Sequence, residues 1–186
     1  RPNVIGYLDA LLERKPVGQR VAVIGAGGIG FDVSEFIVHK GDSPSLNTEH
    51  FMKEWGVDLS VEHRGGIQGV TAEVPAPARE VYLLQRKASK VGKNLGKTTG
   101  WIHRTSLKNR HVQMVPGVTY RKIDDEGLHI TVTPKGSEQG EDKILPVDTI
   151  IVCAGQEPLR ELQAGVEAAG IPVHLIGGAD VAAELD

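Results

Sequence analysis

Three of the four glycines in residues 21–32 have a spacing that suits the binding of a dinucleotide. Four apolar residues precede Gly25, Gly27 and Gly30, and a helical pattern follows them. In such a strand–turn–helix unit the first glycine permits the tight turn, the second lets the backbone approach the pyrophosphate, and the third lets helix and strand lie close. The phosphates then face unpaired backbone N–H groups and the positive end of the helix dipole. We predict a dinucleotide site; the alternative is a turn that only packs the helix on the strand.

A basic loop follows the second apolar strand and bears on which dinucleotide binds. Gln85, Arg86 and Lys87 come directly after residues 80–84, and no acid stands among them. An acid at this point usually holds a ribose 2′-hydroxyl, whereas a 2′-phosphate needs cationic donors. Arg86 can stack on adenine and form a forked pair with the phosphate, and Lys87 adds a point charge. The loop favours NADPH over NADH; the alternative is an ordinary solvated basic loop.

Composition excludes several other classes of function. The formal net charge of −3, with acids and bases mixed, gives no basic excess for nucleic acid. No apolar run is long enough to span a membrane, and no signal peptide is present. Cys153 is the one cysteine, which rules out an internal disulfide and a cysteine-ligated metal site. His103 has no evident acid partner or substrate, so we predict no catalytic residue. We also predict no metal site and a cytoplasmic protein.

The elements that must position these residues follow from hydrophobic periodicity. Helical spacing predicts helices over residues 3–14, 29–39 and 98–109. Apolar runs and period-two alternation predict strands over residues 21–24, 80–84, 112–115, 119–123, 128–133, 144–152 and 173–176, with the buried strand 149–153 continuing from the last meander strand. The crossover rule makes the first three strands parallel. We therefore expect an α/β, Rossmann-like three-layer fold with a parallel sheet and an antiparallel β-meander.

Residues 40–78 interrupt the expected strand–helix–strand unit. They contain Gly, Pro and Ser and a short helical patch at residues 48–55. A connection this long inside a compact domain is usually functional. We interpret it as an insertion or lid. The chain begins at Arg1 rather than Met and stops where a helix pattern begins, so we expect a piece of a larger protein.

The glycine motif, the delayed basic loop, the meander and the turn 154–158 together resemble the pyridine-nucleotide domain of flavoprotein disulfide reductases. The resemblance implies that Asp32 faces the nicotinamide end, and that Gly28 leaves the pocket ungated where the family often has an aromatic residue. It also implies that Gly155, between Ala154 and Gln156, lets the cofactor lie against bare backbone. Gln156 stands where the family frequently has arginine.

The segment 177–180, Gly-Gly-Ala-Asp, resembles the flavin motif of the same family. The resemblance implies that Gly178 and Asp180 contact FAD. It divides the chain into an NADPH-binding domain, residues 1–172 with an insertion at about 40–78, and a C-terminal fragment of a split FAD-binding domain, residues 173–186.

Over nearly its whole length the chain resembles the NADPH domain of bacterial NADPH-dependent 2,4-dienoyl-CoA reductases, as in LQRKASK, GKTTGWIHRTSL, KIDDEG, AGQEP and VHLIGG. The resemblance implies a modular enzyme with an FMN barrel, a 4Fe-4S cluster, an FAD domain and this NADPH domain. Electrons would pass from NADPH through FAD, cluster and FMN to a dienoyl-CoA in unsaturated fatty acid β-oxidation. FAD, FMN and 4Fe-4S are expected only in the full-length protein. The partners of this chain would be the FAD-binding domain and the FMN barrel of the same polypeptide.

The cofactor-binding residues predicted in these ways are Gly25, Gly27, Gly28, Ile29, Gly30, Asp32, Gln85, Arg86, Lys87, Ala154, Gly155, Gln156, Gly178 and Asp180. Three alternatives stay open. The chain is the NADPH domain of another FMN and iron–sulfur reductase of the old-yellow-enzyme type, a non-catalytic dinucleotide-sensing domain, or an interaction domain that binds nothing.

Overall fold

The computed structural model describes residues 1–182, and the chain separates into two compact units, Arg1–Cys153 and Ala154–Asp186. The first unit is built on a sheet of five parallel strands in the order β1-β8-β2-β3-β4. These strands are β1 (Val4–Gly6), β2 (Arg20–Ile24), β3 (Glu80–Leu84), β4 (Gln113–Val115) and β8 (Thr149–Val152). The parallel pairing predicted for β2, β3 and β4 is confirmed.

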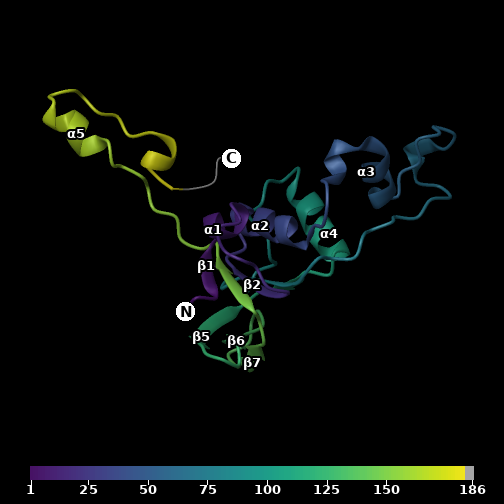
Figure 1. Ribbon diagram of the computed structural model, residues 1–186, viewed down its shortest axis with the longest axis horizontal. Helices are drawn as coiled ribbons and strands as arrows, with labels where there is room; N and C mark the ends of the chain where they lie inside the picture. The colour runs from purple at the N-terminus through teal and green to yellow at the C-terminus, as the bar shows by residue number, and fades with distance from the viewer. Residues whose placement is uncertain (183–186) are drawn as a thin grey trace. The chain divides into compact units, whose positions relative to one another are not determined.

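Helices cover one face of this sheet (Figure 1). They are α1 (Tyr7–Leu11), α2 (Gly28–Val38) and α4 (Gly100–Asn109). Alternate strand residues such as Val21, Val23 and Leu83 point to this face and pack against Phe31 of α2 and Leu107 of α4 in one buried apolar cluster. This cluster holds α2 against the sheet, next to β2.

An antiparallel meander covers the other face (Figure 1). It consists of β5 (Val118–Ile123), β6 (Leu128–Val132) and β7 (Glu141–Leu145), paired in that order. The remaining strand positions, among them Ala22 and Ile150, pack there against Leu128 and Ile130 in a second buried cluster. Helices, parallel sheet and meander form three layers, so the predicted Rossmann-like α/β fold is confirmed.

The insertion at residues 40–78 holds two 3-10 turns, η1 (Pro44–Leu46) and η2 (Arg64–Gly66), and the helix α3 (Thr48–Trp55). The predicted patch at residues 48–55 is confirmed. The helix begins where the Asn47 side chain accepts a hydrogen bond from His50 N–H, and it ends at Gly56, whose φ is +65°. A nearly buried ion pair of 2.7 Å between Glu54 and Arg110 ties α3 to the end of α4.

Three of the predicted elements are wrong. Residues 3–14 were expected as one helix, but they form β1 followed by the short α1, because β1 completes the sheet by pairing with β8. The strand expected over residues 144–152 is divided into β7 and β8, which lie in different sheets. Pro146, which has no backbone N–H to donate to a ladder, stands at the division.

The third correction concerns the second unit, which contains the helix α5 (Gln163–Ala168) and the 3-10 turn η3 (Gly177–Ala179). The strand expected over residues 173–176 is wrong: within residues 154–182 this segment has no strand to pair with. No residue of this range is buried. Among the helices described for the chain, none is long and apolar enough to cross a membrane.

Candidate functional site

The three glycines bring the end of β2 into close contact with the start of α2. Gly25 follows β2 with a φ of +109°, and its N–H donates to the carbonyl oxygen of Leu84 at 3.1 Å. A Cβ at Gly30 would overlap the Gly25 carbonyl oxygen and lie 2.8 Å from its carbon. The turn and the close approach predicted for the first and third glycines are therefore present. Binding of a dinucleotide there stays a prediction.

The N-terminus of α2 has the charge that a pyrophosphate needs. Gly27 is the N-cap residue, no side chain caps it, and the first turn of the helix contains no acidic residue. The positive end of the helix dipole is thus not offset by a carboxylate. Gly27 is exposed, and Gly28 and Ile29 are partly exposed. Asp32 is exposed one turn further along the helix.

The sheet brings the basic loop next to the glycines. Because β2 and β3 pair with Ile24 opposite Leu84, the residues that follow these strands emerge at the same edge. Arg86 and Lys87 are both exposed, and within residues 1–182 no ion pair joins either to a carboxylate. Burial raises the pKa of Tyr120 on β5 to about 12, and the positive charge of Arg86 partly opposes this rise. The charge of Arg86 therefore lies close enough to β5 to influence the pKa of the Tyr120 hydroxyl.

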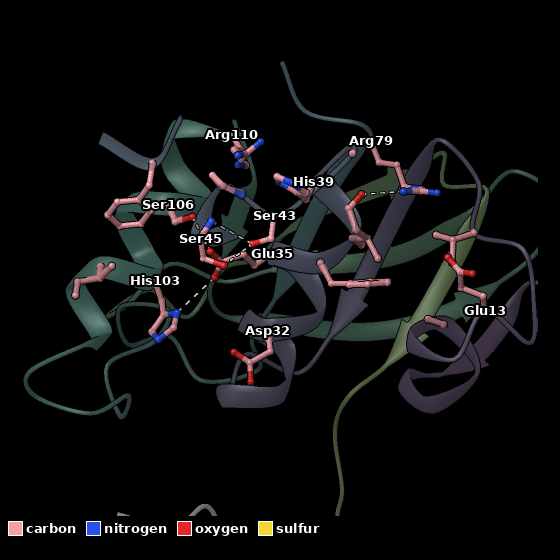
Figure 2. A pocket seen from close by; sticks show the side chains of 18 of the residues that line it. Glu13, Asp32, Glu35, His39, Ser43, Ser45, Arg79, His103, Ser106 and Arg110 are labelled. Atoms are coloured by element: carbon pink, nitrogen blue, oxygen red, sulfur yellow. Dashed lines mark hydrogen bonds and ion pairs between the residues drawn. The ribbon is translucent and has the colours of Figure 1, made fainter. Parts of the chain in front are cut away.

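A cavity of about 990 Å³ in the first unit is lined by residues of α2, α4 and the insertion, among others, and none of residues 25–30 lines it (Figure 2). Asp32 is the one predicted site residue that lines it. Figure 2 shows Glu35 between Ser106 and His103: the Ser106 hydroxyl donates to Glu35 at 3.0 Å, and His103 Nδ1 lies 3.5 Å from its other oxygen. The Ser106 hydroxyl is thus paired with the Glu35 carboxylate and not with the His103 imidazole.

Cys153 ends the first unit directly after β8, and burial raises the pKa of its thiol to about 12. We expect alkylation of Cys153 by iodoacetamide at pH 8 to be at least tenfold slower than that of glutathione, since the thiolate is the nucleophile. Mass spectrometry over a time course measures this rate. Equal rates would contradict a protonated, packed thiol.

The second unit holds its glycine turn through an arginine. Arg160 donates from Nε to the carbonyl oxygen of Ala179 at 2.7 Å and from a terminal nitrogen to that of Asp180 at 2.6 Å. This role could not be predicted from the sequence, because the partners are backbone atoms about twenty positions away. Gly178 and Asp180 are exposed, so contact of this turn with FAD stays a prediction.

The turn after Cys153 is exposed at Ala154, Gly155 and Gln156. Gly155 has a φ of +82°, and a Cβ there would meet no atom within 4 Å. The glycine is therefore required by backbone conformation and not by crowding within the protein. An open strip of backbone of this kind suits contact with a ligand, as the resemblance implied, and that contact stays a prediction.

Comparisons with known proteins bear on the family and the fold of the chain. Residues 8–185 match the model of the pyridine nucleotide-disulphide oxidoreductase family. A metal reductase of Desulforamulus reducens is 24% identical over 177 residues, which cover 95% of this chain and 24% of the relative. A mercuric reductase of Bacillus cereus is 21% identical over 185 residues, covering 92% of this chain and 22% of the relative. The chain thus spans about a quarter of the length of these relatives.

Two solved structures share the fold. A complex of 2-naphthoyl-CoA reductase aligns with a TM-score of 0.56 and 18% identity, over 88% of this chain and 18% of that one. The 6-hydroxypseudooxynicotine amine oxidase of Pseudomonas geniculata aligns with a TM-score of 0.57 and 13% identity, over 90% of this chain and 19% of that one. With the family model matched over almost the whole chain, the protein belongs to the pyridine nucleotide-disulphide oxidoreductases.

Proposed function

We propose that this chain is the NADPH-binding module of a flavoprotein oxidoreductase and presents NADPH to FAD. The observation that supports this most directly is the contact of Gly30 with the Gly25 carbonyl, beside a loop that carries two cations and no acid. Any larger side chain at Gly30 would force the start of α2 away from the turn. The loop offers unpaired charge to a 2′-phosphate.

Each part of the cofactor has residues suited to it. Gly25, Gly27 and the start of α2 would hold the pyrophosphate through backbone N–H groups, and Arg86 and Lys87 would hold the 2′-phosphate. Asp32 would stand near the nicotinamide end. When bound, NADPH supplies a hydride, and the acceptor in this family is a flavin. This chain's residues bind and orient, and we assign none of them as acid or base.

The finer proposal is that the electrons finally reduce a 2,4-dienoyl-CoA, by way of FMN and a 4Fe-4S cluster carried outside this chain. Its support is the resemblance in segments such as residues 84–90 and 96–107, which lie in and after the basic loop. A metal ion is the alternative acceptor, on the names of the two curated relatives. Burial raises the pKa of Cys153, the one thiol of this chain, which does not favour a thiolate ligand for a metal ion. The dienoyl-CoA is therefore the acceptor that we favour.

Titration of the protein with NADPH and NADH tests the proposal. We expect NADPH to bind saturably and at least tenfold more tightly than NADH, because Arg86 and Lys87 add charge-assisted hydrogen bonds. We expect no oxidation of NADPH when a dienoyl-CoA is added to this chain alone. Cofactor fluorescence measures both.

Each contrary result has a distinct meaning. An absence of saturable binding would leave the interaction domain as the better interpretation. A preference for NADH would overturn the roles of Arg86 and Lys87. Reduction of dienoyl-CoA by the chain alone would contradict its assignment as a binding module. FAD bound by a protein in which this segment is joined to its flavin domain, and lost on Asp180→Ala, would favour the reductase over a sensing domain.

A further inference from the structure

The basic loop after β3 is held in one shape by the side chain of Gln85. Its amide nitrogen donates to the carbonyl oxygens of Lys87 and Ser89, each at 2.8 Å, and lies 3.3 Å from the Ser89 hydroxyl. An amide nitrogen has two hydrogens, so both are used on the backbone of the loop. The side chain thus braces the segment that carries Arg86, and it is not directed at a ligand.

The meander supports the same loop from the other side. The N–H of Gly117 donates to the Lys87 carbonyl at 3.1 Å, and the N–H of Val118 donates to the Gln85 carbonyl at 2.9 Å. Gly117 has a φ of +73°, and a Cβ there would overlap the carbonyl oxygen of Thr133. Because the Lys87 carbonyl accepts from both Gln85 and Gly117, the peptide after Lys87 is fixed between two elements of the fold.

The cations on this braced backbone are free to meet a ligand. Arg86 and Lys87 are exposed, and the structure of residues 1–182 pairs neither with a carboxylate. Gln85 itself is only partly exposed. A loop whose backbone is already ordered loses less conformational entropy when its side chains close on a phosphate, so its shape contributes to affinity without contact.

We propose that Gln85 is a positioning residue for NADPH selectivity: its amide holds the backbone of Arg86 and Lys87 so that both cations meet one 2′-phosphate. This inference rests on the proposed function. It assigns Gln85 a role through the loop, in place of direct contact with the cofactor. NADH lacks the phosphate that these cations meet, so its affinity does not depend on the brace.

The variant Gln85→Met tests this inference, because methionine has nearly the same size and no donor. We expect the Kd for NADPH to rise about tenfold and that for NADH to stay within twofold. The same contrast should appear with 2′,5′-ADP against 5′-AMP, which carry only the adenosine end. Calorimetric titration at one fixed salt concentration measures all four Kd values.

The matched control is Gln113→Met, which removes the same group from the first residue of β4. The Gln113 amide nitrogen donates to Glu80 at 3.3 Å, and its side chain also acts on the Tyr82 hydroxyl. Within residues 1–182 no hydrogen bond joins this side chain to the basic loop. We expect it to leave the ratio of the two Kd values unchanged. If Gln85→Met does not fold, Gln85→Glu is the second variant. It keeps the length of the side chain and places an acceptor against the same two carbonyls. We expect it to lower the ratio of the Kd for NADH to the Kd for NADPH further than Gln85→Met does.

The outcomes separate this inference from the proposed function. If the unsubstituted protein prefers NADPH and the Gln85 variants keep that preference, the inference alone is overturned. A parallel rise of both Kd values would also overturn it, since a general structural role acts on both cofactors. If the unsubstituted protein shows no preference for NADPH, the cofactor assignment and the inference fail together.

Discussion

Alanine at position 30 is expected to abolish NADPH binding and to lower the melting temperature of the protein by about 10 °C. The added Cβ would overlap the Gly25 carbonyl oxygen, which is backbone and cannot rotate away. Overpacking a well-filled site costs about 1–3 kcal/mol, and more where backbone must move. A loss of about 3 kcal/mol shifts the melting temperature of a domain of this size by roughly 10 °C. Because α2 would have to retreat from the turn, the surface for the pyrophosphate would be lost as well.

The control for Gly30→Ala is Gly6→Ala at the end of β1. A Cβ at Gly6 would meet no atom within 4 Å, and the residue has an extended backbone with a φ of −78°. We expect this variant to keep both its melting temperature and its affinity for NADPH. Thermal unfolding followed by circular dichroism, with titration of each folded variant, makes the comparison. An unchanged affinity for NADPH in Gly30→Ala would contradict binding at the glycine loop.

The second large effect is expected from Arg86→Ala. A hydrogen bond to a charged group contributes about 1.5–3 kcal/mol, so the Kd for NADPH should rise roughly 10- to 100-fold. The Kd for NADH should stay within about twofold, because the missing group is the partner of the 2′-phosphate alone. The double variant Arg86→Ala with Lys87→Ala should abolish the preference. The dependence of the Kd on salt concentration should weaken in step, since screened charges are being removed.

Lys108→Ala is the matched change for Arg86→Ala. Lys108 is an exposed cation in the last turn of α4, and its removal alters the net charge by the same amount. We expect no change in either Kd. A rise in the Kd for NADPH as large as that of Arg86→Ala would show that total charge, and not the basic loop, determines selectivity.

Elements with strong local signals could be predicted to the residue. The helix α3 and the strand β3 have the predicted bounds, residues 48–55 and 80–84. A capping Asn47 and a left-handed Gly56 delimit the helix, and both act through neighbouring atoms. The glycine loop belongs to the same class, since turn and close approach are encoded within six positions.

Elements that depend on distant partners could not be predicted in this way. The helical spacing of residues 3–14 extends through β1, whose extended form is stabilised by β8 almost 150 positions later. Residues 173–176, three of them apolar, have the composition of a strand, yet within the described part of their unit no strand pairs with them. In both segments the presence or absence of a partner strand determines whether a strand forms, and a single sequence does not show which strands pair.

The residues of the candidate site could be predicted from the sequence. The contacts that hold the backbone of the basic loop could not. Arg86 and Lys87 were found because their charges are visible in the sequence. The use of the Gln85 amide within the loop depends on Gly117 and Val118, which come from the meander some thirty positions on. The charge of a residue can be read locally, whereas the shape of the backbone that presents it depends on tertiary contacts.

The place of β8 between β1 and β2 determines when this sheet can be completed during synthesis. Strands β2, β3 and β4 can associate while the meander is still being translated, but among residues 1–182 β1 pairs with β8 alone. The nascent chain therefore carries an unpaired N-terminal strand, and a bare edge on β2, until residue 152 has left the ribosome. Open edges of this kind recruit other chains. Translation that stops before β8 should yield a product that aggregates.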